Sequence, residues 1–473
     1  MVKVNAWRLG TEHIVDITGL THDGMGVGRI ESRVLFVPET IPGDRVLARL
    51  SHIKERLAYG ELVRMLEPSP NRREPSCPHA PLCGGCQLQH MDYQAQLHWK
   101  RQQVADALAR LGGLEVEVLP TLGMDEPYHY RNKAQLPLGK KGGELVMGFF
   151  QQGSHDIVDL STCEIQHPLI TKLALAVKRV VGDLGIEPYD EGRHAGVLRH
   201  AVIRVSFLES KLMLTLVTRT RELHRQGELI ARLTAEVPEL VSVVHSINPQ
   251  VTNVILGRET KVLWGEACLY DAIGHLRYAI SPMSFFQVNP LQTKVLYDLV
   301  RERLKLSGRE TVLDLYCGAG TIGLYLADRA GRVIGVESVA AAVEDARRNA
   351  ELNGITNADF FAGRAEEELP RLVRRFGTID AAVVDPPRKG CDPAVLEALS
   401  GAAVPAIVYV SCNPSTLARD LSRLAELGYQ AGPAQPVDMF PWTRHVESCV
   451  LITRDEKSCA EMAVKKGFAG YKD

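Results

Sequence analysis

Side chains able to do chemistry together recur along the C-terminal part of the chain. Cys412 follows an apolar run, residues 406–410, and opens the turn Ser-Cys-Asn-Pro. Asp385 ends a second apolar run and opens the turn Asp-Pro-Pro-Arg, and Glu447 is an isolated acid. A glycine-rich loop over residues 314–320 precedes them. The set combines a nucleophilic thiol, two carboxyl groups and a loop whose backbone can approach a ligand closely.

This combination fits methylation of carbon 5 of uracil. Carbon 5 is a poor nucleophile until a thiolate adds to carbon 6, and Cys412 is suited to that role. After methyl transfer the carbon 5 proton must leave before the thiol can be expelled, and Glu447 is the candidate base. The alternative is that Cys412 is a small buried side chain and Glu447 a solvated one, since free cysteine is among the most buried residue types. The neighbouring turn and loop favour catalysis.

An open α/β sheet would bring these groups together, because such sheets bind ligands at the carboxyl ends of their strands. Residues 311–315 and 332–336 read as short buried strands, and a helix is expected from about Thr321. The second strand leads into Glu337, where a carboxylate can accept hydrogen bonds from ribose hydroxyls. No Gly-Lys-Ser/Thr follows the loop, which disfavours a phosphate-binding loop of that type. S-adenosylmethionine, which carries no phosphate, suits this loop better.

Two other classes of methyltransferase fit the motifs less well. Amino-group methylases often carry an Asp/Asn-Pro-Pro turn that ends in a stacking aromatic residue, whereas this chain has Arg388 there. DNA cytosine-5 methylases place their cysteine after a proline and earlier relative to the donor loop. The order of motifs in this chain favours RNA as the substrate.

In these motifs the chain resembles the S-adenosylmethionine-dependent RNA uridine-5-methyltransferases, especially the iron–sulfur-containing bacterial enzymes that modify 23S ribosomal RNA. The matching stretches are residues 281–290, 314–320, 385–390, 411–414 and 445–447, in that order. The resemblance implies Cys412 as nucleophile, Glu447 as general base and Phe285 near the target base. It implies contacts with the donor, or with the surroundings of its methyl group, for Gln287, Tyr316, Glu337 and Asp385. Glycines 318 and 320 are expected to shape the backbone.

A second group of chemistry-bearing residues lies in the N-terminal half. Cys77, Cys83 and Cys86 crowd onto a loop rich in glycine and proline, where thiolates can converge on one metal centre. Spacing alone does not separate an iron–sulfur cluster from zinc, for which His79 or His90 could complete the site. The family resemblance implies a [4Fe-4S] cluster held by Cys77, Cys83, Cys86 and Cys163.

The remaining cysteines and the start of the chain bear on the cellular compartment. Ten cysteines in 473 residues, without a secretory signal at the start, indicate a reducing cytoplasm rather than a disulfide framework. Cysteines without such grouping are expected to be packing or surface residues: Cys268, Cys317, Cys391, Cys449 and Cys459.

Residues 8–67 alternate short apolar runs with turns, which predicts a small β-barrel of oligonucleotide-binding type. This stretch resembles the TRAM domain that accompanies RNA-modifying enzymes. Basic residues dot its strands and its exit, and the barrel context favours contact with an RNA backbone. They are Arg45, Arg49, Lys54, Arg56, Arg64, Arg72 and Arg73.

The middle of the chain reads as a mixed α/β region. A helix is expected over about residues 93–110, and residues 202–207 and 212–217 are expected to pair as a hairpin. Basic and imidazole residues gather near that hairpin, and their alternative reading is a solvated strand face. They are Arg131, Lys133, Lys140, Lys141, Arg193, His194, Arg199, His200 and Arg204, of which Arg131 is the preferred RNA contact.

The predicted fold class is α/β. A Rossmann-like class I methyltransferase domain over residues 271–455 follows a mixed α/β central domain, which in turn follows the TRAM-like barrel. The full set of expected units is 8–67 (barrel), 68–92 (cysteine loop), 93–270 (central domain), 271–455 (methyltransferase domain) and 456–473 (polar tail).

Composition limits the choice of partners. A formal net charge of −2 gives no overall attraction to nucleic acid, so any RNA footprint must be a local basic patch. No apolar run is long enough to cross a bilayer. We therefore expect a soluble, cytoplasmic protein with no membrane partner, and we expect it to be a monomer. The family resemblance implies that it acts on unassembled or partly assembled 23S ribosomal RNA.

Two alternative functions remain. One is a transfer-RNA uridine-5-methyltransferase, although that branch of the family is expected to lack both the cluster and the barrel. The other is a non-catalytic, redox-sensing iron–sulfur protein that binds RNA through a vestigial methylase fold. Retention of the complete set of catalytic and donor-binding residues disfavours this second alternative.

Overall fold

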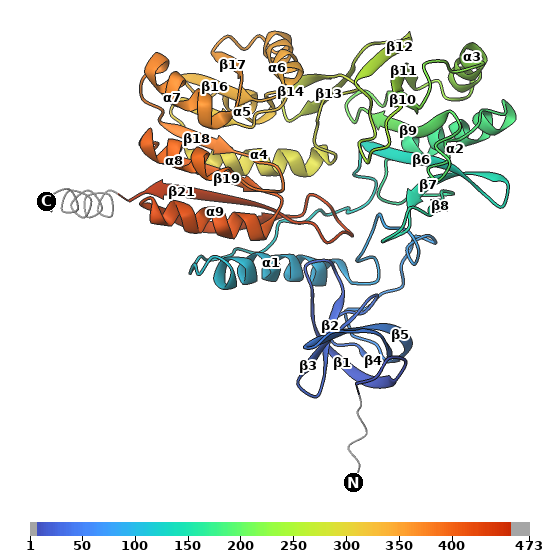
Figure 1. Cartoon of the computed structure of the whole chain (residues 1–473). Coiled ribbons are helices and arrows are strands. Elements are labelled where there is room, and N and C mark those ends of the chain that lie inside the picture. The colour runs from blue at the N-terminus through green and yellow to red at the C-terminus, as the bar shows by residue number, and fades with distance from the viewer. Residues whose placement is uncertain (1–6, 456–473) are drawn as a thin grey trace, which may run out of the picture.

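The computed structural model describes residues 7–455. The expected tail, 456–473, and Cys459 lie outside the described residues. Figure 1 shows three bodies: a barrel at the bottom, a large sheet flanked by helices at the upper left, and a second sheet at the upper right. Of the helices in residues 7–455, none is long and apolar enough to cross a membrane.

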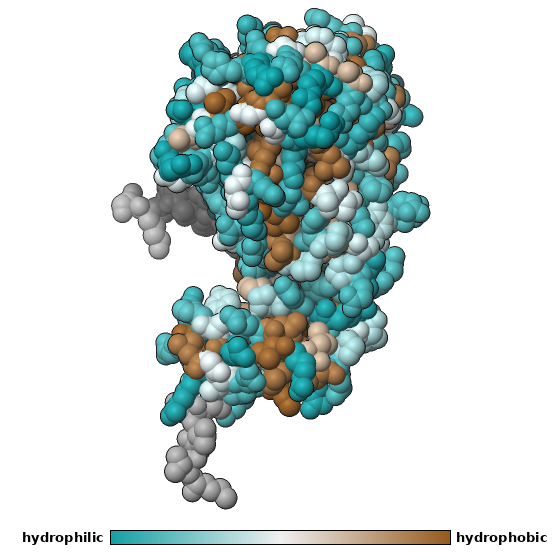
Figure 2. Space-filling view, turned by 90° about the vertical axis from the view of Figure 1, so that its right-hand side faces the viewer, coloured by the Kyte–Doolittle hydropathy of each residue, from teal (hydrophilic) through white to brown (hydrophobic). Residues whose placement is uncertain are grey.

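The N-terminal body is a closed five-stranded barrel in the order β1-β2-β3-β5-β4, which confirms the predicted barrel. Alternate residues point inward, and the small core includes Val15, Leu35 and Val46. In Figure 2 the barrel forms a lobe below the main body, joined to it by a narrower waist. Its strands are β1 (Glu12–Leu20), β2 (Gly26–Ile30), β3 (Arg33–Val37), β4 (Arg45–Ile53) and β5 (Leu57–Glu67).

The second body is a seven-stranded sheet in the order β12-β11-β10-β9-β6-β7-β8. The predicted hairpin is present, since β9 and β10 pair antiparallel with Val205 opposite Leu212. Two helices cover this sheet and complete one apolar core. The elements are β6 (Lys133–Lys141), β7 (Glu144–Phe150), β8 (Ile157–Asp159), α2 (Pro168–Asp183), β9 (Leu198–Val205), β10 (Leu212–Thr218), α3 (Gln226–Glu236), β11 (Leu240–Ile247) and β12 (Glu259–Gly265). A two-stranded hairpin, β13 (Leu269–Ile273) and β14 (Leu276–Ile280), leads to the third body.

The third body is a seven-stranded sheet in the order β17-β16-β15-β18-β19-β21-β20. Strands β15 to β19 run parallel, and β21 pairs antiparallel with both β19 and β20. This is the predicted Rossmann-like arrangement. Its strands are β15 (Thr311–Leu315), β16 (Arg332–Glu337), β17 (Ala358–Ala362), β18 (Ala381–Val384), β19 (Ala406–Ser411), β20 (Tyr429–Val437) and β21 (Glu447–Arg454). Its helices are α4 (Pro290–Leu304), α5 (Thr321–Leu326), α6 (Ala340–Leu352), α7 (Ala365–Phe376), α8 (Pro393–Gly401) and α9 (Pro414–Glu426).

Helices cover both faces of this sheet, which explains why its central strands are mostly apolar. One core contains residues of α4, α5 and α6, and the other contains residues of α7, α8 and α9. Helix α1 (Tyr93–Arg110) joins the second core through Val104 and Leu108 and packs against α9, although it precedes the central sheet in sequence. In Figure 1 it lies between the barrel and the sheet of the third body.

Candidate active site

The predicted catalytic and donor-binding residues lie around one cavity of about 600 Å³. It opens at the carboxyl ends of β15, β16, β18 and β19, where a doubly wound sheet binds its ligands. The β20–β21 loop and the segment before α4 close its other side. Its wall includes Phe285, Gln287, Tyr316, Glu337, Asp385, Cys412 and Glu447. We refer to it as the donor cavity.

The glycine-rich loop forms the floor of the donor cavity through an unusual backbone path. Tyr316, Gly318 and Gly320 all have positive φ, of 64°, 54° and 76°. The backbone amide of Gly318 donates to Glu337 at 3.2 Å, and Val339 donates its amide to the other oxygen of that carboxylate at 2.8 Å. Glu337 is therefore held by backbone amides at the end of β16.

Carboxyl groups give the donor cavity a strongly acidic character. Asp314 is fully buried beneath the loop and accepts the amide of Gly323 at 2.8 Å. Burial raises the pKa of Asp314 to about 7, and the negative charges of Asp385 and Glu337 add to the shift. Burial likewise raises the pKa of Asp385 to about 7. Such a cavity favours a cationic ligand, because a positive charge relieves the repulsion among the carboxylates.

Cys412 is partly buried, at the junction of β19 and α9. The next residue, Asn413, caps α9 by accepting the amide of Ser415 at 3.0 Å, and its side-chain amide donates to the carbonyl oxygen of Arg388 at 3.0 Å. Burial, with the negative charges of Glu447 and Asp385, raises the pKa of the Cys412 thiol to about 11. In the free protein this thiol is therefore protonated at neutral pH.

Glu447 is the first residue of β21 and is only 5% exposed. Its position rules out the alternative of a solvated acid. Burial raises the pKa of Glu447 well above its ordinary value, the charge of Asp385 raises it further, and Arg388 opposes the shift. Once ionised, a carboxylate with a raised pKa in a cavity wall is basic enough to accept a proton.

Arg388 and His445 also line the donor cavity, and neither was singled out for a role in the sequence. The positive charge of Arg388 lowers the pKa of both Cys412 and Glu447 against the effect of burial. Burial, together with Arg388 and Arg444, lowers the pKa of His445 to about 4, so its imidazole is neutral. A signal for both was present, because Arg388 belongs to the turn Asp-Pro-Pro-Arg and His445 begins the matching stretch 445–447.

The four predicted cluster cysteines lie around a second cavity, of about 470 Å³, which we call the cysteine cavity. Burial raises the pKa of all four thiols, in the case of Cys163 to about 11. Within residues 7–455, no group of three or more His, Cys, Asp or Glu side chains has the spacing to hold a metal ion. Phe285 and His445 line both cavities, so the two share a wall.

The other predicted residues have mixed surroundings. Arg131, the preferred RNA contact, lies in the wall of the cysteine cavity. In the barrel, Arg45 and Arg49 pair with acidic neighbours and Arg72 with the buried Asp44. The expectation of a solvated or RNA-facing strand does not hold for Arg199 and Arg204, because both are buried and donate to backbone carbonyls. The expected packing cysteines Cys317, Cys391 and Cys449 are buried.

Comparison with known proteins places this geometry in a family. The model of the tRNA (uracil-5-)-methyltransferase family matches residues 92–455, and that of the TRAM domain matches residues 6–63. An RNA methyltransferase of Halalkalibacterium halodurans is 49% identical over 439 residues, covering 93% of this chain and 96% of the relative. One of Clostridium tetani is 47% identical over 437 residues, covering 92% and 95%.

A solved structure matches the fold over nearly its whole length. The tRNA (uracil-54, C5)-methyltransferase of Pyrococcus abyssi, in complex with S-adenosyl-L-homocysteine, superposes with a TM-score of 0.75 at 30% identity. The match covers 93% of this chain and 99% of that enzyme. So large a share cannot be reached without the barrel, so the expectation that transfer-RNA enzymes lack the barrel is wrong for this relative. The chain belongs to the S-adenosylmethionine-dependent uracil-5 RNA methyltransferase family.

Proposed function

We propose that this chain transfers the methyl group of S-adenosylmethionine to carbon 5 of a specific uridine in 23S ribosomal RNA, giving 5-methyluridine. One observation carries the chemistry: Cys412 and Glu447 face the same cavity as the glycine-rich loop, Glu337 and Asp385. A thiol, a basic carboxylate and an acidic donor site are the three parts that methylation at carbon 5 requires.

In the proposed reaction, the Cys412 thiol first releases its proton to solvent, which the positive charge of Arg388 favours. The thiolate then forms a bond with carbon 6 of the uracil, and the carbon 5–carbon 6 double bond becomes enolate-like. Carbon 5 then takes the methyl group, and the bond between that methyl group and the donor sulfur breaks. Glu447 removes the carbon 5 proton, the electrons of that C–H bond restore the double bond, and the thiolate leaves. Asp385 and Gln287 hold the uracil edge or the surroundings of the methyl group, and Tyr316 and Glu337 hold the donor.

A uridine inside a stack cannot offer one face to Cys412 and the other to the methyl donor, so the proposed enzyme extrudes it from folded RNA. Phe285 is 71% exposed on the wall shared by the two cavities, a place where an aromatic ring can stack on a base. The barrel and Arg131 contact the RNA backbone in this proposal. The enzyme acts as a cytoplasmic monomer on unassembled or partly assembled 23S RNA.

The cysteine cavity has the donor set that a [4Fe-4S] cluster requires. Four thiols lie around one space together with apolar side chains such as Leu160 and Ile165. Each thiolate of such a cluster binds a different iron, so the four sulfur atoms need not reach a single ion. Bonding to iron would also offset the burial that disfavours free thiolates here. We propose Cys77, Cys83, Cys86 and Cys163 as the ligands, and a bound cluster would cross-link their loops.

A second candidate substrate is transfer RNA. The Pyrococcus abyssi relative that matches nearly all of this chain is named as a tRNA (uracil-54, C5)-methyltransferase. The barrel therefore does not separate the two substrates, and the resemblance of the C-terminal motifs to the iron–sulfur-containing 23S enzymes is what supports the ribosomal choice.

The test of the proposed function uses anaerobically purified protein, labelled S-adenosylmethionine and unmodified transcripts of 23S, 16S and transfer RNA. We expect 5-methyluridine in 23S RNA alone, and none with Cys412→Ala. We also expect Glu447→Gln to accumulate an RNA adduct that resists denaturant. Label in transfer RNA would establish the second candidate. No label in any RNA would overturn the proposal in favour of a non-catalytic RNA-binding protein.

A further inference from the structure

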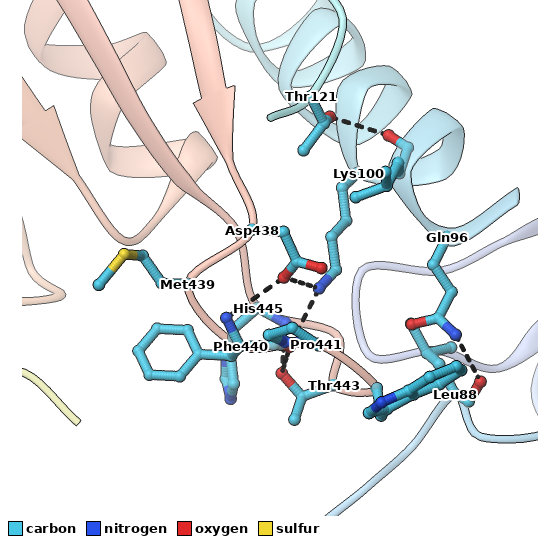
Figure 3. Close-up of polar contacts among 12 residues, drawn as sticks. Leu88, Gln96, Lys100, Thr121, Asp438, Met439, Phe440, Pro441, Thr443 and His445 are labelled. Atoms are coloured by element: carbon cyan, nitrogen blue, oxygen red, sulfur yellow. Dashed lines mark hydrogen bonds and ion pairs between the residues drawn. The ribbon is translucent and has the colours of Figure 1, made fainter. Parts of the chain in front are cut away.

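The β20–β21 loop, residues 438–446, begins at a buried ion pair. Lys100 of α1 donates to Asp438 Oδ1 at 2.6 Å and to the carbonyl oxygen of Phe440 at 3.1 Å (Figure 3). Both charged side chains are fully buried. Apolar pairs of similar size are often as stable as buried ion pairs, so stability alone does not explain this one.

Both oxygens of the Asp438 carboxylate accept hydrogen bonds. Oδ1 also accepts the amide of Phe440 at 3.2 Å, and Oδ2 accepts the hydroxyl of Tyr93 at 3.0 Å. The same Tyr93 oxygen accepts the amide of Met124 at 2.9 Å. Directed bonds of this kind fix a backbone more sharply than apolar contact can, because each bond requires a particular distance and angle.

The loop pinned at Asp438 ends at the proposed base. Val437, the last residue of β20, pairs with Glu447, the first residue of β21. Asp438 therefore directly follows the residue that pairs with Glu447. Within the loop, Phe440 and His445 contact each other edge to face, and both line the donor cavity beside Glu447.

The other side of the donor cavity is tied to the same loop. Asn289, two residues after Gln287, donates to the carbonyl oxygen of Met439 at 3.0 Å. Gln292 donates to the carbonyl oxygen of Asp438 at 3.1 Å. Both acceptors are backbone oxygens, so Asp438→Asn removes neither bond.

We propose that the Lys100–Asp438 pair is a positioning device for proton abstraction, which holds the β20–β21 loop so that Glu447 meets the carbon 5 proton of the methylated adduct. This inference rests on the proposed function and deepens it. Lys100 and Asp438 are positioning residues: neither lines the donor cavity, and both act through the loop. The step that they assist is the transfer of the carbon 5 proton to the Glu447 carboxylate, in which the C–H electrons restore the double bond and expel the thiolate of Cys412.

The test separates adduct formation from proton removal. RNA carrying 5-fluorouridine should form the methylated adduct with Cys412, but it offers no carbon 5 proton. The rate at which this adduct forms therefore does not depend on the base. RNA carrying 5-deuterouridine reports proton removal through its isotope effect on turnover. The first variant, Asp438→Asn, keeps the shape of the side chain but removes its charge. The second combines Lys100→Met with Asp438→Leu, which replaces the ion pair by apolar side chains and so leaves no unpaired buried charge that could prevent folding.

We expect both variants to form the fluorouridine adduct at close to the wild-type rate. Turnover of ordinary RNA should fall by about 100-fold, which is the effect of a misplacement on the order of 1 Å. The deuterium isotope effect should rise above its wild-type value, because proton removal becomes rate-limiting. Asp44→Asn, which changes the ion pair between Arg72 and the buried Asp44 of the barrel, should leave the isotope effect unchanged.

Two results would overturn the inference. One is an equal loss of adduct formation and turnover, which would mean that the pair supports the whole site. The other is an unchanged isotope effect in both folded variants. Failure of the wild-type protein to form any fluorouridine adduct would instead refute the proposed function, so the two failures are distinguishable.

Discussion

The side-chain amide of Asn413 donates to the carbonyl oxygen of Arg388 across 3.0 Å and so links the turn that carries Cys412 to the turn that begins at Asp385. The two turns end neighbouring parallel strands, β19 and β18. Asn413 also caps α9. A single side chain thus both caps a helix and links the turn of Cys412, the proposed nucleophile, to the turn of Asp385.

These two roles of Asn413 can be separated by mutation. Asn413→Asp keeps an oxygen that accepts the amide of Ser415 but loses the donor to Arg388, so we expect near-normal stability and slower adduct formation. Asn413→Ala loses both and should also lower the free energy of unfolding by about 1 kcal/mol. Thermal denaturation and single-turnover rates check this. Equal activity of Asn413→Asp and wild type would show that the link between the turns does not matter.

Arg388 should control the ionisation of Cys412. Burial and two carboxylates raise the pKa of this thiol to about 11, and Arg388 opposes them. Arg388→Gln should raise the pKa further and slow alkylation of Cys412 by iodoacetamide between pH 8 and 10, by about tenfold for each unit of pKa, since only the thiolate reacts. Peptide mass spectrometry measures the reaction at this cysteine. Arg388→Lys, which keeps the charge, is the matched control and should retain most of the wild-type rate.

Donor binding should release protons near neutral pH. The pKa values of Asp314 and Asp385 are raised to about 7 in the free protein, and a sulfonium cation favours their charged forms. Affinity for S-adenosylmethionine should therefore rise as pH increases from about 6 to 8. Calorimetry in buffers of different ionisation enthalpy measures the released protons. S-adenosylhomocysteine, which lacks the sulfonium charge, should release fewer, and equal release by both ligands would contradict this account.

The same carboxyl groups set a pH dependence of stability. Their folded-state pKa is raised above the ordinary value of 3.8, so the stability they contribute is complete below pH 3.8 and is lost as pH rises through about 7. Without donor, the midpoint of thermal unfolding should fall as pH rises from about 4 to 7 and level off above that range, and saturating S-adenosylmethionine should reduce the fall near neutral pH. Asp314→Asn should flatten the profile of the free protein. An unchanged profile in that variant would assign the effect to other groups.

The two glycines of the donor loop should differ in their tolerance of alanine. Both have positive φ, but a Cβ on Gly318 would meet no atom within 4 Å, whereas a Cβ on Gly320 would meet the ring of Phe360 at 2.9 Å. Gly318→Ala should cost about 1–2 kcal/mol from the left-handed backbone alone. Gly320→Ala should cost more and weaken donor binding further. Chemical denaturation and donor titration of both variants check the ranking.

Loss of one cysteine should show whether the cysteine cavity holds iron. We expect anaerobically purified wild-type protein to contain iron and sulfide and to absorb visible light, and Cys163→Ser to lose both properties. Cys449→Ser, a buried cysteine of the methyltransferase core, is the control and should keep the iron. An iron-free wild-type protein, with zinc bound in its place, would contradict the cluster.

Local patterns of residues were enough to predict the fold class, the barrel, the strands that carry the site, and Cys412, Glu447, Glu337 and Asp385 as its candidates. Gln287 and Tyr316 became candidates only through the family resemblance. Short apolar runs followed by glycine or proline turns are local signals, and a parallel sheet gathers the ends of its strands at one edge. The helix from Thr321 and the hairpin of β9 and β10 were predictable for the same reason.

Other features exist only once the chain has folded. Three of these features involve residues far apart in sequence. They are the ion pair between Lys100 and Asp438, the burial of Glu447 and Arg204, and the wall that the two cavities share at Phe285. The placement of α1 on α9, away from its sequence neighbours in the central sheet, is of the same kind. Burial and ion pairing depend on what packs from distant segments, and a local pattern of residues carries no information about that packing.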